Sequence, residues 1–171
     1  DRQFADRDVK LLQLIASTIA RPIQRDWDHK KFRPDEYPQI FISYVREDAQ
    51  FVKQLADELR KRFIRVWFDE RLEAGGRWRE RVLKAIKSVD CVVLVLSPEA
   101  SKSEAVIWEV DMTYHQEKAI FPLAYRSTAL PDTIANLQYI EFGENKDSST
   151  YEVGLRSLVD QIKRHVQDAT M

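Results

Sequence analysis

Cys91-Val92-Val93-Leu94-Val95-Leu96 is a run of six apolar residues, three of them valine, and it decides the fold class. A strand that is apolar at every position is typical of the centre of a parallel sheet, because helices cover both faces of such a sheet. Parallel neighbours are joined by crossover connections, which are usually helices. The run therefore predicts an α/β domain in which strands and helices alternate along the chain.

The segments on either side of this run show that alternation. Besides the central run, strands are predicted at residues 39–43, 64–68, 119–124 and 137–142. Helices with apolar residues at spacings of three and four are predicted at residues 48–62, 78–89, 103–117 and 151–166. Asp48 stands at the start of the first of these helices, where its carboxylate is predicted to cap free backbone amides. The alternation predicts right-handed βαβ units and one parallel sheet.

The beginning of the chain has a different pattern. Leu12, Ile15, Ile19 and Ile23 recur along one face of a predicted amphipathic helix at residues 4–24. The predicted organisation is a connector helix at 1–25, a linker at 26–37 and the α/β domain at 38–168. A lone amphipathic helix cannot bury its apolar face. That face is therefore expected to pack on the α/β domain, on a second copy of the chain or on a domain outside this sequence.

The composition argues against several classes of protein. Lys and Arg total 27 against 28 Asp and Glu, so the chain lacks the basic excess of a nucleic-acid-binding protein. No apolar run approaches the ~20 residues that span a bilayer, and the first residues do not read as a signal peptide. The single cysteine, Cys91, is predicted to be a buried structural thiol in a cytoplasmic protein. His29, His115 and His165 are far apart without a Cys or His cluster, so no metal site is expected.

Three segments carry motifs at the ends of predicted strands. Phe41-Ile42-Ser43-Tyr44 closes the first strand, and residues 68–78 (FDERLEAGGRW) follow the second. The first segment is similar to the opening motif of the TIR domain family, and the second resembles the family's loop after the second strand. Leu96-Ser97-Pro98, followed by Ser103 and Glu109, resembles the segment after the third strand. The resemblance covers about 130 residues. It implies a flavodoxin-like, three-layer α/β fold with a five-stranded parallel sheet in the order 2-1-3-4-5.

A second, shorter resemblance concerns the connector helix. Phe4-Ala5-Asp6-Arg7-Asp8, followed by Leu11-Leu12-Gln13-Leu14-Ile15-Ala16, is similar to the closing helix of a GAF sensor domain. It implies a protein in which this helix connects a GAF sensor domain to a TIR output domain. The alternative is a helix that simply packs on the TIR domain.

The TIR resemblance implies cleavage of NAD+ between nicotinamide and ribose, with NAD+ as the substrate and no cofactor. The catalytic glutamate of the family commonly lies six residues after a serine, and Glu109 fills that position relative to Ser103. One carboxylate is enough for this chemistry, because nicotinamide leaves a pyridinium as a neutral molecule and needs no proton. An ionised Glu109 would stabilise the oxocarbenium-like ribosyl cation and orient the ribose and the attacking group.

The remaining candidate residues are assigned to substrate binding. Aromatic rings at Tyr44, Phe68 and Trp78 are candidates to stack on the bases of NAD+, although Phe68 and Trp78 equally fit core packing. Arg46 is a candidate to meet a phosphate, or else a surface charge. The motifs contribute four further candidates: Asp69, Leu72, Gly75 and Ser103.

One position departs from the family pattern. Enzymatic members often carry a tryptophan two residues after the motif serine, where this chain has Ala105. Trp108 stands next to Glu109 instead, but neighbouring helix positions diverge by ~100°. Trp108 therefore cannot simply replace the missing ring.

Two functions remain open on sequence alone. The first is an NAD+ glycohydrolase that acts as a homodimer or higher homo-oligomer, held through the TIR domain and the N-terminal helix. The second is a non-enzymatic signalling module that docks other TIR domains through the loop at residues 69–78. Glu109 at the motif position favours the first. Neither a membrane nor a nucleic acid is an expected partner, and the linear or cyclic form of the product stays open.

Overall fold

The computed structural model describes residues 37–69, 76–126, 128, 137–142 and 148–169. The chain divides into two units, Asp1–Glu36 and Tyr37–Met171, and the described residues belong to the second. The predicted connector helix and linker, with the GAF-like segment, lie outside the described residues, and so do Leu72 and Gly75.

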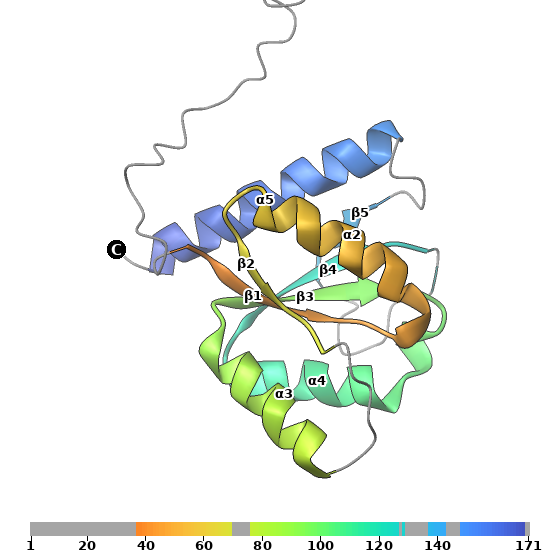
Figure 1. The fold of residues 1–171 in the computed structure, drawn as a ribbon, viewed down its shortest axis with the longest axis vertical. Coiled ribbons are helices and arrows are strands. Elements are labelled where there is room, and N and C mark those ends of the chain that lie inside the picture. The colour runs from red at the N-terminus through yellow and green to blue at the C-terminus, as the bar shows by residue number, and fades with distance from the viewer. Residues whose placement is uncertain (1–36, 70–75, 127, 129–136, 143–147, 170–171) are drawn as a thin grey trace, which may run out of the picture. The chain divides into compact units, whose positions relative to one another are not determined.

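Five parallel strands form one sheet in the order β2-β1-β3-β4-β5 (Figure 1). The strands are β1 (Gln39–Ser43), β2 (Arg65–Trp67), β3 (Cys91–Leu96), β4 (Ala119–Ala124) and β5 (Ile140–Glu141). The predicted strand order and the parallel pairing are confirmed. As the sequence indicates, β3 is central and buried at all six positions.

Helices cover both faces of this sheet and make the fold three-layered. They are η2 (Arg46–Asp48), α2 (Ala49–Arg60), α3 (Gly76–Ser88), η3 (Ala100–Lys102), α4 (Glu104–His115) and α5 (Ser149–Ala169). In Figure 1, α2 and α5 lie on one side of the sheet, and α3 and α4 lie on the other.

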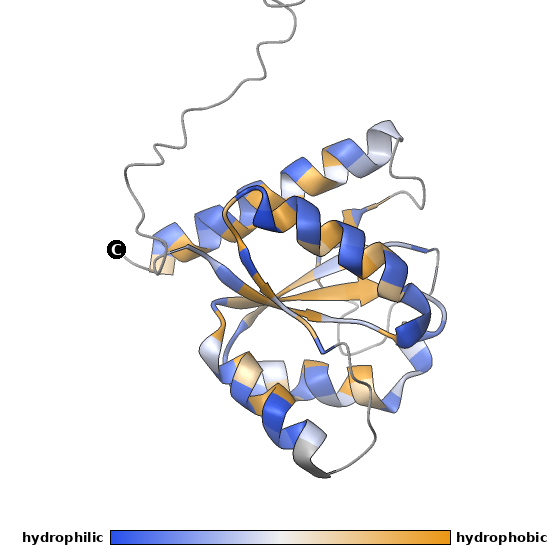
Figure 2. Ribbon diagram, viewed as in Figure 1, coloured by the Kyte–Doolittle hydropathy of each residue, from blue (hydrophilic) through white to orange (hydrophobic). Residues whose placement is uncertain are grey.

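Alternate residues of the central strand serve the two layers. Cys91, Val93 and Val95 belong to the core cluster under α2 and α5. Val92 packs with residues of α3, and Leu94 packs with residues of α4. This period of two explains why no position of β3 is polar, and Figure 2 shows the apolar strands between the helices.

Two predicted details are wrong. Strand β5 spans Ile140–Glu141 instead of 137–142, because an edge strand has a ladder on one side only and pairs here with just two residues of β4. Asp48 does not cap α2 with its side chain. Its carboxylate accepts hydrogen bonds from Ser97 and Arg126 instead, so tertiary partners outcompete the local amides.

Helix α5 approaches β5 so closely that Gly154 has no room for a side chain. A Cβ atom at this position would lie 2.5 Å from the carbonyl oxygen of Glu141 and 2.8 Å from Cδ2 of Phe142. We expect Gly154→Ala to lower the free energy of unfolding by about 1–3 kcal/mol, since the backbone must shift to admit the methyl group. Urea denaturation measures this change, with the exposed neighbour Val153→Ala as the control. Equal midpoints for the two variants would contradict the close packing.

Candidate active site

Glu109 is a buried carboxylate on the inner face of α4. The helix begins after Ser103, whose hydroxyl accepts a hydrogen bond from the amide of Val106 at 3.4 Å. Glu109 is only 6 % exposed, whereas Ile107, on the outer face, is 45 % exposed. A glutamate in the middle of a helix normally points to solvent, so this orientation itself marks Glu109 as unusual.

The end of strand β1 supplies the hydrogen-bond partner of this carboxylate. Ser43 Oγ donates to Glu109 Oε2 at a distance of 2.5 Å, and both side chains are buried. Sequence analysis missed Ser43 as a site residue. The sequence does contain a pattern that indicates the direction of Ser43, because residues two apart in a strand share a face. Ser43 follows Phe41, which packs against α3, so the hydroxyl had to face the same helical layer.

The environment of Glu109 favours its protonated form. The pKa of this carboxyl is raised from an ordinary value of 4.5 to about 8, and burial is the main cause. Within this net effect, the hydrogen bond from Ser43 lowers the pKa and the negative charge of Asp69 raises it. A group of this kind at the carboxyl edge of a parallel sheet is a candidate catalytic residue on physical grounds.

Tyr44 ties the end of β1 to the segment that leaves β2. Its hydroxyl donates to the carbonyl oxygen of Asp69 at 2.9 Å, and its ring meets the ring of Phe68 edge-on at 6.0 Å. The carboxylate of Asp69 pairs with Arg81 of α3 at 3.5 Å. The charge of Asp69 acts on Glu109, whereas the ring of Tyr44 belongs to the core cluster under α2 and α5.

The other predicted aromatic contacts are core contacts in this structure. Phe68 is partly buried against the cluster under α2, with the guanidinium of Arg60 5.6 Å from its ring centroid. Trp78 packs on Trp108 with 5.5 Å between ring centroids, in the cluster between α3 and the sheet. Trp108 thus faces α3, and Arg79 lies over its ring. The core interpretation of Phe68 and Trp78 accounts for these contacts.

The side chain of Arg46 is exposed to solvent, whereas that of Ser103 is engaged at the start of a helix. Arg46 is exposed in η2, just beyond the end of β1. The hydroxyl of Ser103 serves as the N-cap of α4, which explains a serine at that position without any ligand.

A second buried carboxylate lies at the same edge of the sheet. Asp48 is 2 % exposed and accepts hydrogen bonds from Ser97 Oγ at 2.6 Å and from Arg126 Nη2 at 2.7 Å. Arg126 also pairs with Glu99. Because a cation and a hydroxyl both satisfy Asp48, this cluster reads as a structural link between the ends of β1, β3 and β4.

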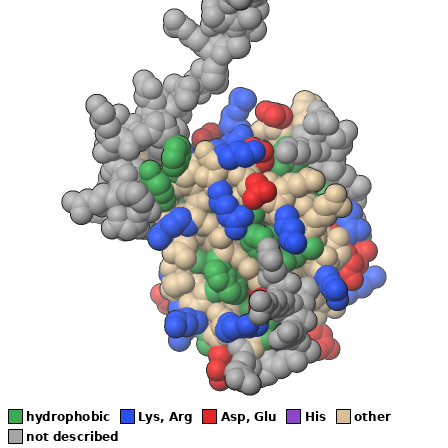
Figure 3. Space-filling model, viewed as in Figure 1, with side chains coloured by type: hydrophobic (Ala, Val, Ile, Leu, Met, Phe, Trp, Pro, Cys, Tyr) green, Lys and Arg blue, Asp and Glu red, His purple; other side chains and the backbone are tan. Residues whose placement is uncertain are grey.

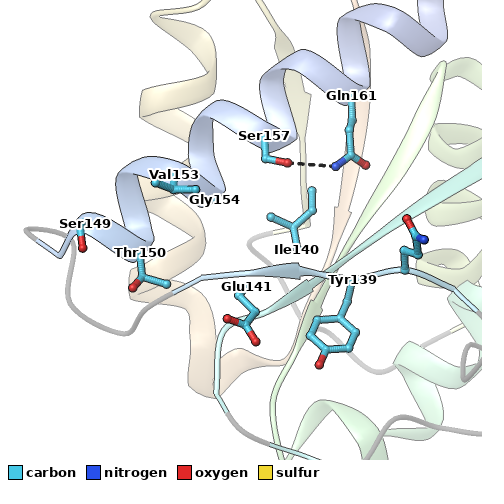
Figure 4. Close-up of a pocket in the computed structure, with 10 residues that line it drawn as sticks. Tyr139, Ile140, Glu141, Ser149, Thr150, Val153, Gly154, Ser157 and Gln161 are labelled. Atoms are coloured by element: carbon cyan, nitrogen blue, oxygen red, sulfur yellow. Dashed lines mark hydrogen bonds between the residues drawn. The ribbon is translucent and has the colours of Figure 1, made fainter.

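Two surface pockets among the described residues are lined by side chains other than Glu109. A pocket of about 420 Å³ opens between β5 and α5, where Ser157 accepts a hydrogen bond from Gln161 (Figure 4). Another, of about 590 Å³, lies on the outer face of α4 beside Ile107 and Tyr114. Glu109 lines neither of them.

The described residues contain no group of three or more His, Cys, Asp and Glu side chains that could hold a metal ion. No helix among them is long and apolar enough to cross a membrane. On the face in Figure 3, Lys and Arg side chains are dispersed over the surface rather than gathered in one stripe.

The fold and this site define a flavodoxin-like α/β domain with a buried carboxylate at the carboxyl edge of its sheet. The family model described as "TIR domain" matches residues 40–159. The chain therefore belongs to the TIR domain family.

Two known proteins with similar sequences are named as a cyclic ADP-ribose synthase and an NAD+ hydrolase. The chain is 30 % identical over 105 residues to "Probable 2' cyclic ADP-D-ribose synthase TcpO" of Methanobrevibacter olleyae, covering 58 % of this chain and 30 % of that protein. It is 25 % identical over 136 residues to "NAD(+) hydrolase TcpC" of Escherichia coli O6:H1, covering 75 % of this chain and 43 % of that protein. The chain thus spans less than half the length of these relatives.

A solved structure supports the fold. The TIR domain of the Toll-related receptor TRR-2 from Hydra magnipapillata superposes with a TM-score of 0.62 at 21 % identity. The match covers 72 % of this chain and 97 % of that domain. The predicted TIR fold is therefore confirmed.

Proposed function

We propose that this chain cleaves NAD+ between nicotinamide and ribose and releases nicotinamide with ADP-ribose or a cyclic isomer. The observation that carries the proposal is the burial of Glu109 at the carboxyl edge of the sheet, with its carboxylate held by Ser43. The names of the relatives support NAD+ as the substrate class. NAD+ is consumed in this reaction and does not serve as a cofactor.

The reaction needs one negatively charged group beside the reacting carbon, ribose C1′. The bond between the ring nitrogen and ribose C1′ breaks, and nicotinamide leaves as a neutral molecule with the bonding electrons. The positive charge then rests on the ribosyl oxocarbenium ion, which the carboxylate of Glu109 stabilises. Water attacks C1′ and loses a proton to give ADP-ribose, whereas a hydroxyl group of the same molecule attacks to give a cyclic product.

The raised pKa of Glu109 matches a cationic substrate. Ser43 is the neutral hydrogen-bond donor that the described residues give to this buried carboxylate, so the ionised form carries a desolvation cost before substrate binds. The nicotinamide ring of NAD+ carries a positive charge, and an opposite charge nearby favours the ionised form. Substrate binding therefore lowers the pKa of Glu109 and produces the carboxylate that the reaction uses.

The motif residues divide into two proposed groups. We assign Asp69 and Tyr44 to the reacting end of the substrate, because the charge of Asp69 acts on Glu109 and the Tyr44 hydroxyl donates to the carbonyl oxygen of Asp69. Arg46 is exposed in η2, beyond the end of β1, and is the proposed phosphate contact. The other proposed substrate-binding residues, on motif position alone, are Phe68, Leu72, Gly75, Trp78 and Ser103.

A non-enzymatic docking module is the second candidate function, and one observation favours it. The outer face of α4 exposes Ile107 and Tyr114, at 45 % and 44 %, beside an open pocket. Apolar side chains gathered on one exposed face are typical of protein contacts. The same face is compatible with an enzyme that acts only when copies associate, so self-association belongs to both proposals.

A concentration series separates the two candidates. We expect nicotinamide release from NAD+ per molecule of protein to rise with protein concentration, because association assembles the active form. Chromatographic measurement of nicotinamide is paired with light scattering on the same samples. Association without nicotinamide release at any concentration would favour the docking module. Constant activity per molecule across the series would contradict activation by self-association.

A further inference from the structure

Strand packing alone does not explain why the hydroxyl of Ser43 is buried and contacts a carboxylate. It is 1 % exposed at the end of β1, where its register partner on β3 is the apolar Leu94. A hydroxyl in such surroundings needs a partner, because burial without one costs free energy. Among the described residues, that partner is the carboxylate of Glu109.

Two hydrogen bonds from different elements hold Glu109, one at its backbone carbonyl and one at its side-chain carboxylate. Thr113 Oγ1, one turn further along α4, donates to the carbonyl oxygen of Glu109 at 2.6 Å. Ser43 reaches Oε2 from the sheet. The helix therefore fixes the backbone of Glu109, and the strand fixes the tip of its side chain.

The type of donor matters as much as its position. A hydroxyl stabilises the ionised carboxylate without cancelling its charge, whereas an arginine or a lysine would neutralise it and compete with a cationic ligand. Asp69, which follows β2, is the charged group of the described residues whose field raises the pKa of Glu109. The carboxylate of Asp69 itself pairs with Arg81 on α3.

We infer that Ser43 is a positioning residue of the reaction: its hydroxyl holds Oε2 of Glu109 and leaves Oε1 as the oxygen that meets the ribosyl cation. This inference rests on the proposed function for its catalytic meaning. The contact between Ser43 and Glu109 stands apart from that function, because it can be measured without turnover.

The test compares Ser43→Ala and Ser43→Thr with a matched control, Ser97→Ala. Ser97 also donates from a strand end to a buried carboxylate, that of Asp48, at 2.6 Å. We expect Ser43→Ala to lower kcat about 100-fold with KM nearly unchanged, since a misplaced reacting group costs roughly that much. Ser43→Thr keeps the hydroxyl and should recover most of kcat. Ser97→Ala should lose thermal stability and keep kcat.

The pH profile adds a measurement that a purely structural role would not move. Loss of the hydroxyl removes an interaction that lowers the pKa of Glu109, so the acid limb of kcat/KM should move to higher pH in Ser43→Ala. It should return toward the parent position in Ser43→Thr. Equal losses of kcat in Ser43→Ala and Ser97→Ala, with an unmoved acid limb, would overturn the inference.

A titration keeps this inference distinguishable from the proposed function. Carbon-13 NMR of labelled glutamate side chains, assigned with Glu109→Gln, follows the Glu109 carboxyl in each variant without substrate. A higher titration midpoint in Ser43→Ala, reversed in Ser43→Thr, supports the contact even if no variant cleaves NAD+. In that case the proposed function is rejected, and the inference about Ser43 still holds. An unchanged midpoint in Ser43→Ala overturns the inference, whatever the activity.

Discussion

Glu109→Gln should abolish nicotinamide release and at the same time make the domain more stable. Glutamine matches the shape of glutamate and can still accept from Ser43, but it cannot carry the charge that meets the ribosyl cation. Loss of a preorganised electrostatic group of this kind lowers turnover by roughly 10³-fold or more. The variant therefore separates the charge of Glu109 from its packing.

The gain in stability follows from the raised pKa. The carboxyl has a pKa of about 8 in the folded protein and 4.5 as its ordinary value, so between these pH values the folded state holds a proton that the unfolded state has lost. Stability therefore falls as the pH rises through this window, and the loss is complete above it. Each tenfold difference in proton affinity is worth ~1.4 kcal/mol. We expect Glu109→Gln to be more stable than the parent by several kcal/mol at pH 9, and by little at pH 4.5.

Glu104→Gln is the matched control, because Glu104 lies on the same helix with its side chain exposed. Nicotinamide release and urea denaturation at the two pH values cover both halves of this expectation. Glu104→Gln should keep its activity and its stability. Full turnover by Glu109→Gln would reject Glu109 as the reacting group, and a loss of stability at pH 9 would reject its raised pKa.

The second large effect is on the pH dependence of the reaction. The acid limb of kcat/KM reports the free protein, so it should lie near pH 8, where the carboxyl of Glu109 loses its proton. Activity requires the ionised form, and kcat/KM should therefore be about 100-fold below its plateau at pH 6. The acid limb of kcat should lie at lower pH, because the positive charge of bound NAD+ favours the carboxylate.

Initial rates of NAD+ cleavage between pH 5.5 and 9.5, at low and at saturating substrate, give the two profiles. The separation between their acid limbs measures how far the bound cation lowers the pKa of Glu109. A kcat/KM that stays flat from pH 6 to pH 9 would contradict the raised pKa, and coincident limbs would contradict its coupling to the substrate charge.

The fold was largely predictable because one strand has an unambiguous pattern. Cys91–Leu96 is apolar at every position, and only a strand covered on both faces requires this. At the sheet edge, the pattern at 137–142 predicts more strand than forms, because Ile140–Glu141 pairs on one side only. Asp48 failed as a predicted cap for a different reason. Its partners Ser97 and Arg126 are distant in sequence, and local pattern cannot reveal them.

The site was predictable in part, from motif position more than from physical pattern. Glu109 was predicted by its distance from Ser103, yet nothing local indicates that a mid-helix glutamate is buried. Ser43 could have been found from the two-residue period of β1, which places it on the face of Phe41. The charge of Asp69 near Glu109 depends on segments brought together only by the fold.

The absence of the usual tryptophan at Ala105 also has a structural counterpart. Trp108 does not take its place, because its ring packs against Trp78 and under Arg79 at the seam between α3 and α4. Tyr44 remains the proposed aromatic contact to the substrate, and its hydroxyl donates to the carbonyl oxygen of Asp69.

The most direct test of the central claim is to identify the products formed from NAD+. The full chain is incubated with NAD+ at the highest attainable protein concentration, and mass spectrometry identifies and quantifies the products. We expect nicotinamide to accumulate in equal amount with ADP-ribose, linear or cyclic, and Glu109→Gln to form neither. A folded, self-associated chain that releases no more nicotinamide than Glu109→Gln would contradict the claim that this TIR domain cleaves NAD+.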